Sequence, residues 1–120
     1  KKMKIVGFKI PVLDLDKAIE FYVDILGFSL VFRADEFGWL TIQRESVQFG
    51  LYIPGQGGGT REPGGSIDFS FSVEDIVSLQ SNLKKNNALV SDIANTADGM
   101  QVIDVTDPFG NVLTFRKQNN

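Results

Sequence analysis

The residues best suited to chemistry in this chain are polar and aromatic side chains that alternate with apolar ones along its predicted strands. Alternate residues of a strand lie on the same face of a sheet, so we expect these side chains to share one face. Aromatic rings among a few hydrogen-bonding groups are typical of a small-molecule site, although a polar, water-facing sheet is an open alternative. The predicted ligand-binding residues are Lys9, Trp39, Thr41, Gln48, Gly50, Tyr52, Asp68, Ser70, Thr114 and Arg116.

Two missing residue types restrict the chemistry, because the chain has neither histidine nor cysteine. Histidine is the commonest general base and transition-metal ligand, so any metal here would need oxygen ligands alone. Asp68 is the one candidate catalytic residue, either as a general base or as the counter-ion of a cationic group. It could equally be a solvated carboxylate, or form a salt bridge with Lys9 or Arg116. We therefore predict no cofactor and no metal.

Apolar periodicity predicts which elements must position these side chains. In the first half, Asp14 is expected to cap a helix that stops at Gly27. In the second half, Ser72 and Asp75 form a capping-box pattern before a helix that ends near Asn86. The predicted strands cover residues 4–12, 29–33, 37–44, 47–54, 66–72, 89–93, 100–106 and 112–117.

The order of elements repeats along the chain. Val12-Leu13-Asp14-Leu15 and Val73-Glu74-Asp75-Ile76 each join a strand to a helix, and the second lies 61 residues after the first. The repeat predicts an α+β fold of two tandem β-α-β-β-β modules, which form a curved mixed sheet around a concave cleft. A chain of 120 residues is long enough for one core. We expect a single domain over residues 1–120, with modules at about 3–54 and 66–117 and a glycine-rich linker at 55–65.

Two longer motifs accompany the repeat. Val12-Leu13-Asp14-Leu15-Asp16-Lys17-Ala18-Ile19-Glu20-Phe21-Tyr22, followed by Leu26-Gly27-Phe28, and the turn Asp107-Pro108-Phe109-Gly110-Asn111-Val112-Leu113 resemble signatures of the vicinal oxygen chelate superfamily. This superfamily includes glyoxalase I, extradiol dioxygenases and bleomycin-resistance proteins. In its metalloenzymes, four sheet positions hold His or Glu, and the resemblance assigns them to Gly7, Gly50, Asp68 and Thr114. It therefore implies a member that lacks the metal ligands.

The resemblance implies a metal-free small-molecule binding protein, with an antibiotic as one possible ligand, similar to the bleomycin-resistance branch. Trp39, Tyr52 and Asp68 would supply stacking and charge. One alternative is a glyoxalase- or dioxygenase-like lyase or isomerase, with Asp68 as base and Arg116 or Lys9 as electrostatic stabiliser. Another is a protein-interaction module whose cleft is filled by its own loop or by a partner chain. Binding without turnover is the expected role.

Charge and hydropathy predict the partners. The net charge is −3 and no long basic run occurs, which argues against nucleic acid. No apolar stretch approaches the roughly 20 residues that span a bilayer, so no membrane partner is expected. We expect a cytoplasmic protein. A homodimer is implied by the resemblance, since members of the superfamily commonly pair.

Overall fold

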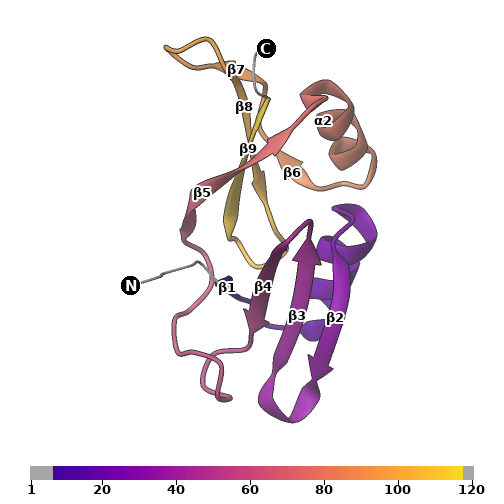
Figure 1. The fold of residues 1–120 in the computed structure, drawn as a ribbon, viewed down its shortest axis with the longest axis vertical. Coiled ribbons are helices and arrows are strands. Elements are labelled where there is room, and N and C mark those ends of the chain that lie inside the picture. Colours follow the sequence, from indigo (N-terminus) through magenta and orange to yellow (C-terminus); the bar gives the residue numbers. More distant parts are fainter. Residues whose placement is uncertain (1–6, 118–120) are drawn as a thin grey trace. The chain divides into compact units, whose positions relative to one another are not determined.

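The computed structural model describes residues 7–117, with the side chains of residues 66–69 left out of the description. The chain divides into two compact units, the first ending at Pro63 and the second beginning at Gly64. Each unit consists of helix and a mixed β-sheet, and each is described by itself below (Figure 1). The predicted α+β fold with a repeated order of elements is confirmed.

The first unit contains a four-stranded sheet with the strand order β1-β4-β3-β2. β1 is parallel to β4, and the other neighbours are antiparallel. One helical segment connects β1 to β2, and a short 3₁₀ turn connects β2 to β3. The elements are β1 (Phe8–Pro11), α1 (Leu15–Ala18), η1 (Ile19–Ile25), β2 (Ser29–Ala34), η2 (Asp35–Phe37), β3 (Trp39–Arg44) and β4 (Val47–Tyr52).

The helix of the first unit begins and ends where the sequence predicts. The Asp14 carboxylate accepts a hydrogen bond from the Lys17 backbone N–H, and Gly27 adopts a left-handed φ of 85°. Its middle differs from the expected α-helix, because α1 continues as the π-helical segment η1. Phe21 and Tyr22 are neighbours in sequence and both are buried in this segment.

Aromatic rings connect this helix to one face of the sheet. Tyr22 packs edge-on against Phe28 at 6.1 Å between ring centroids, and Phe28 packs edge-on against Phe49 at 5.6 Å. Ile10, Leu40, Ile42 and Leu51 are buried on the same face of the sheet as Phe49. The alternate residues of these strands therefore lie on the face opposite to the helix.

The second unit contains a five-stranded sheet with the order β5-β9-β8-β6, and β7 also pairs with β8. β5 is parallel to β9, as β1 is to β4 in the first unit. Ile76 and Leu83 on the helix are buried, as are Ile103, Val105, Leu113 and Phe115 in the sheet. The elements are β5 (Ser66–Val73), α2 (Ile76–Lys85), β6 (Leu89–Val90), β7 (Ala94–Asn95), β8 (Gln101–Thr106) and β9 (Val112–Lys117).

The strand predicted over residues 89–93 is divided in two. β6 ends at Val90 and β7 begins at Ala94, and both pair with β8. Between them, the Ser91 hydroxyl accepts a hydrogen bond from the Asp104 backbone N–H at 2.9 Å. This side chain takes the place of a backbone acceptor, so the regular ladder is interrupted here.

The N-terminus of α2 also differs from the prediction. Asp75, and not Ser72, caps the helix, since its carboxylate accepts from both the backbone N–H and the hydroxyl of Ser78. Ser72 lies within β5 opposite Arg116, because the strand continues as far as Val73. The predicted end of the helix near Asn86 is confirmed.

The turn between β8 and β9 is a buried polar cluster. The Asp107 carboxylate accepts from the backbone N–H groups of Phe109 and Asn111, and the Asn111 amide donates to it at 2.8 Å. The Asn111 side-chain oxygen accepts from the Gly64 backbone N–H at 3.0 Å. Asp107 and Asn111 are buried, so these bonds satisfy polar groups that water does not reach. The turn motif therefore supports the scaffold.

Candidate functional site

The face of the first sheet opposite to the helix carries all six site residues predicted from the first half of the chain. Residues that are paired across neighbouring strands form a row of the sheet. Lys9 and Thr41 flank Gly50 in one row, and Trp39 is paired with Tyr52 in the next row. Gln48 pairs with Gln43 on the other side of the Gly50 row. We call this surface the open face; it comprises Lys9, Trp39, Thr41, Gln43, Gln48, Gly50 and Tyr52.

The indole of Trp39 lies across Gly50. Its Nε1–H donates to the Thr41 hydroxyl at 2.8 Å, which directs the ring from its own row over the neighbouring one. A Cβ atom at position 50 would lie only 2.2 Å from Cη2 and 2.5 Å from Cζ2 of this ring. The indole therefore occupies the space that any side chain at position 50 would need.

Gly7 is closed to a side chain for a different reason. A Cβ atom there would lie 2.4 Å from the backbone oxygen of Gln48, and a backbone atom of the neighbouring strand cannot move aside as a flexible side chain can. Gly7 and Gly50 are two of the four positions that the resemblance assigns to metal ligands. Within residues 7–117, described side chains form no cluster of three or more possible metal-ligating residues. Positions 7 and 50 therefore offer no side chain to a metal ion and have no room for one.

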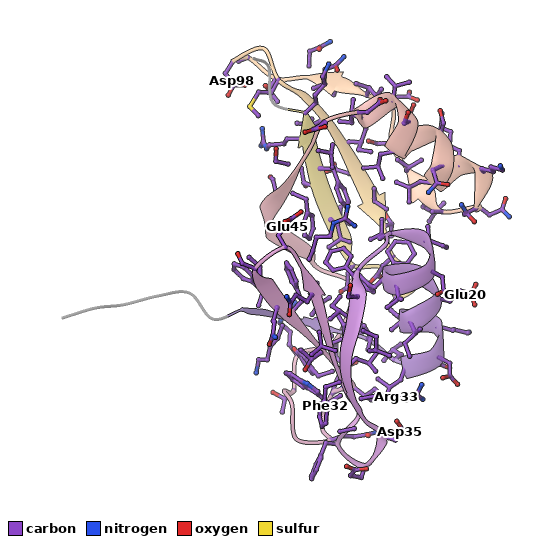
Figure 2. The ribbon with its side chains drawn as sticks, turned by 45° about the vertical axis from the view of Figure 1, so that its right-hand side comes forward. Glu20, Phe32, Arg33, Asp35, Glu45 and Asp98 are labelled. Atoms are coloured by element: carbon purple, nitrogen blue, oxygen red, sulfur yellow. The ribbon has the colours of Figure 1, made fainter. Side chains whose placement is uncertain are left out.

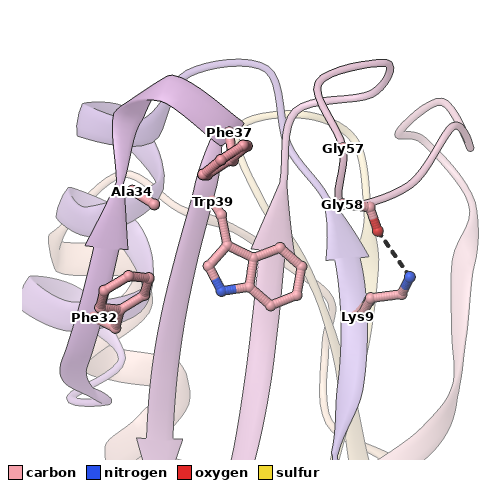
Figure 3. A pocket seen from close by; sticks show the side chains of 7 residues that line it. All are labelled: Lys9, Phe32, Ala34, Phe37, Trp39, Gly57 and Gly58. Carbon is pink, nitrogen blue, oxygen red and sulfur yellow. Dashed lines mark hydrogen bonds between the residues drawn. The ribbon is translucent and has the colours of Figure 1, made fainter.

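Two hollows lie on the open face, and Lys9 and Trp39 line both of them. Figure 3 shows the residues that line the larger one. The larger, of about 480 Å³, lies toward Phe32 and Phe37, and the smaller, of about 360 Å³, lies over Thr41 and Gln48. In Figure 3 the indole of Trp39 lies between Phe32 and Lys9. Hollows of this size, walled by aromatic rings, provide the apolar contact area that a small molecule requires.

Sequence reasoning missed Phe32, which reaches this surface through a β-bulge. Leu30 pairs with Ile42 but Phe32 pairs with Thr41, so Val31 is an extra residue in β2. The bulge brings Phe32 onto the same row as Thr41, with 57% of its surface exposed. Leu30-Val31-Phe32 is a continuous apolar run without alternation, and nothing in it predicts which ring faces outward.

Phe37, also missed, projects from η2 at the rim of the larger hollow. Arg33 and Asp35 lie close together (Figure 2), and the Arg33 side chain fixes this turn because it donates to the carboxylate of Asp35 and also to that of Asp16. Its hydrogen bond to Asp35, followed by that to Asp16, raises the pKa of Arg33 above its ordinary value. The guanidinium therefore links β2 to the start of α1 and to η2.

The glycine-rich segment predicted as a linker folds back over the open face. A Cβ atom on Gly58 would lie 2.8 Å from both Trp39 Cε3 and Tyr52 Cβ, and one on Gly59 would lie 2.6 Å from Tyr52 Cε2. Residues without side chains are required for such a close approach to the rings. The hydrogen bond from the Gly55 N–H to the Gly59 oxygen closes the turn at 2.8 Å.

This cover buries Tyr52. Only 3% of the surface of Tyr52 is exposed, because Gly58 and Gly59 lie on it, and its role in stacking on a ligand stays a prediction. Tyr52 supports Lys9, whose Nζ lies 5.5 Å from the ring centroid and donates to the Gly58 oxygen at 2.7 Å. Of the two aromatic residues predicted for the site, Trp39 is the one that remains partly accessible.

Three residues predicted from the second half lie on the corresponding face of the second sheet, namely Ser70, Thr114 and Arg116. Thr114 pairs with Ser70 on one side and Asp104 on the other, and its hydroxyl donates to the Asp104 carboxylate at 2.9 Å. Arg116 donates from Nε to the Ser70 hydroxyl at 3.0 Å. Asp104 was missed, although its alternation with Ile103 and Val105 places it on this face.

Asp68 lies in β5, but its side chain is outside the described part of the structure. Ser66 pairs with Val112 and Ser70 with Thr114, so the register shifts between these two pairs. Simple alternation, by which we placed Asp68 beside Ser70, is interrupted at this point. Its assignment as ligand-binding or catalytic residue stays a prediction.

Comparison with known proteins identifies the family. The model of the Glyoxalase/Bleomycin resistance protein/Dioxygenase superfamily matches residues 4–115. The chain belongs to this superfamily. Among curated proteins, no sequence matches it significantly.

Solved structures of the superfamily fold resemble this member closely. A superfamily protein from Sphaerobacter thermophilus DSM 20745 has a TM-score of 0.85 and 25% identity, over 97% of this chain and 98% of the other. A lactoylglutathione lyase from Agrobacterium tumefaciens has a TM-score of 0.83 and 17% identity, over 97% and 94%. The antibiotic-binding protein TnmS3 from Streptomyces sp. CB03234 has a TM-score of 0.80 and 21% identity, over 99% of each chain.

Proposed function

We propose that this superfamily member binds a small molecule, without a metal ion, on the open face of its first unit. The observation that carries the proposal is the position of the Trp39 indole across Gly50. Where the resemblance assigns a metal ligand, this chain has a glycine covered by an aromatic ring. A glycine in place of a metal-ligating side chain removes a site for a metal ion, and the ring that covers it provides a flat apolar surface for a ligand.

The surroundings of the indole support binding. Phe32 and Phe37 are 57% and 58% exposed, and both line the larger hollow with Trp39. Such exposure of rings around one hollow costs solubility unless a partner covers them, and it is typical of a binding site. The glycine-rich segment covers Tyr52 but leaves Trp39 partly accessible, which favours a small molecule over a face filled by the protein itself.

The structural neighbours act in two ways that this fold allows, as an antibiotic-binding protein and as a lactoylglutathione lyase. The proposal follows the binding neighbour because side chains at positions 7 and 50 are sterically excluded here. An antibiotic is one class of ligand that it includes. The lyase alternative, with Asp68 as base, predicts turnover that is lost in Asp68→Asn.

A fluorescence titration tests the proposal directly, since Trp39 is the single tryptophan of the chain. Aromatic and cationic glycopeptide antibiotics, α-oxo acids and thiol adducts would be titrated with EDTA present, and Mn²⁺, Ni²⁺ and Zn²⁺ would be titrated alone. We expect a saturable change in emission with one organic class, a raised Tm, and no effect of the metals. Trp39→Leu should abolish the rise in Tm. A strong shift caused by a divalent metal would contradict the proposal.

Three sequence predictions accompany the proposed function. We propose a homodimer, which light scattering coupled to size-exclusion chromatography would test, and a cytoplasmic location without a nucleic-acid partner. Within residues 7–117, no helix has the length and apolar character needed to cross a bilayer.

A further inference from the structure

We propose that the ligand of the open face is a planar aromatic molecule that carries an anionic group, with Lys9 as the residue that selects its charge. This inference rests on the proposed function and narrows it to one class of ligand. It differs from the cationic group that the sequence analysis considered as a partner of Asp68. The argument has three steps: the charge that lines the hollows, the way that Lys9 is held, and the direction of the nearby hydrogen-bond donors.

Lys9 is the only charged side chain among the described residues that line the two hollows, and it borders both of them. Its ammonium forms no ion pair with any carboxylate that the structure describes. The rest of the larger hollow is apolar, with the rings of Phe32, Phe37 and Trp39 (Figure 3). A positive charge beside an aromatic wall is complementary to an aromatic anion.

The Lys9 ammonium is held at the edge of the site before any ligand arrives. One of its three N–H groups donates to the Gly58 oxygen at 2.7 Å, and the ring of Tyr52 lies beneath it at 5.5 Å. A backbone carbonyl and an aromatic ring orient the cation without neutralising its charge. Two donors remain for a ligand, and little side-chain entropy is lost when they are used.

Thr41 adds a second donor on the other side of Gly50. Its hydroxyl oxygen accepts from the Trp39 indole, so its own proton is available to donate. Lys9, Gly50 and Thr41 form one row of the sheet, and both donors border the smaller hollow. The anionic group of a ligand stacked on the indole would therefore meet a donor on each side of Gly50, whereas a cationic group at the same place would be repelled by Lys9.

Three ligands of the same shape test the preference for charge: 2-naphthoate, the neutral 2-naphthamide and the cation 2-naphthylmethylammonium. Calorimetry would give their Kd values, and the single indole N–H resonance in ¹⁵N-correlated spectra would show whether each binds at Trp39. We expect naphthoate to bind at least about tenfold more tightly than the other two, as is usual for one charge-assisted hydrogen bond. Among the three ligands, only naphthoate should bind more weakly as the salt concentration rises from about 20 to 200 mM.

Variants of Lys9 separate its charge from its packing. Lys9→Met should reduce the affinity for naphthoate about tenfold, to the level of naphthamide, whose affinity should not change. Lys9→Arg should keep the preference for the anion. Lys17→Met is the matched control, because it removes the same charge from an exposed position on α1, and it should leave all three affinities as in the unmodified protein.

The outcomes distinguish this inference from the proposed function. Equal binding of the three ligands, tighter binding of the cation, or an unchanged preference in Lys9→Met would overturn the inference and leave the binding site standing. If none of the three binds but a compound of the wider panel shifts the indole resonance, the inference alone fails. If no compound in either screen moves that resonance, both proposals fail.

Discussion

The two units repeat one topology but use the free face of their sheets differently. The register makes Lys9, Gly50 and Thr41 equivalent to Ser70, Thr114 and Asp104, because each set is one row across three strands. In the first unit this row is bridged by the Trp39 indole. In the second unit, the row is joined by the hydrogen bond from Thr114 to Asp104.

The middle residue of the row accounts for the difference. Gly50 has no side chain, so a ring from the next row can lie flat across it and leave hollows at its sides. Thr114 has a side chain, and the register puts Val102 where the first unit has Trp39. Its neighbours Ser70 and Asp104 pair with polar groups of the same sheet. The first face therefore has hollows beside a partly accessible ring, whereas polar groups on the second face bond to one another.

The largest expected effect is a loss of stability, and it distinguishes residues that hold the fold together from residues that bind the ligand. Asn111→Ala removes a buried amide that bonds Asp107 and Gly64, and it should lower the free energy of unfolding by about 2–4 kcal/mol. Trp39→Leu, in a partly accessible ring, should lower it much less while it abolishes ligand binding. Urea unfolding of both variants would measure this. A comparable loss of stability in Trp39→Leu would mean that the indole belongs to the scaffold.

An exchange of the middle residues tests the comparison itself. Gly50→Thr places a side chain where the indole lies, so it should displace Trp39, abolish ligand binding and cost about 1–3 kcal/mol. The reverse variant, Thr114→Gly, removes one exposed hydrogen bond and should leave binding unchanged. Trp39 emission, ligand titration and urea unfolding would report these effects. Unimpaired binding in Gly50→Thr would show that the ligand does not use the indole surface.

The smallest expected effect concerns the helix caps. Asp75 accepts hydrogen bonds from the backbone and hydroxyl of Ser78, which lowers the pKa of its carboxyl group below the ordinary value. A lowered pKa in the folded state means that the stabilisation is complete above the unfolded-state pKa and is lost as pH falls through the folded one. Urea unfolding at several pH values should show that the free energy of unfolding falls less on acidification in Asp75→Asn than in the unmodified protein. If the two proteins lose the same free energy of unfolding as pH falls, the Asp75 carboxylate does not stabilise the fold in this way.

Elements with strong local signals were predicted well. The cap at Asp14, the stop at Gly27 and the turn from Asp107 to Asn111 depend on residue types that act within a few positions of themselves. Alternation likewise placed Lys9, Trp39 and Gln48 on one face. The predictions failed where a side chain or an extra residue replaced a backbone pairing, as at Ser91 and Val31.

The sequence by itself determined the family, the repeat, and the absence of side chains at positions 7 and 50, because each is a matter of residue type and spacing. Tertiary structure decided how the glycines are used. The indole covers Gly50, the glycine-rich segment covers Tyr52, and a bulge brings Phe32 to the rim of the hollow. These contacts join residues that are distant in sequence or shifted in register, and only packing against a formed sheet selects them.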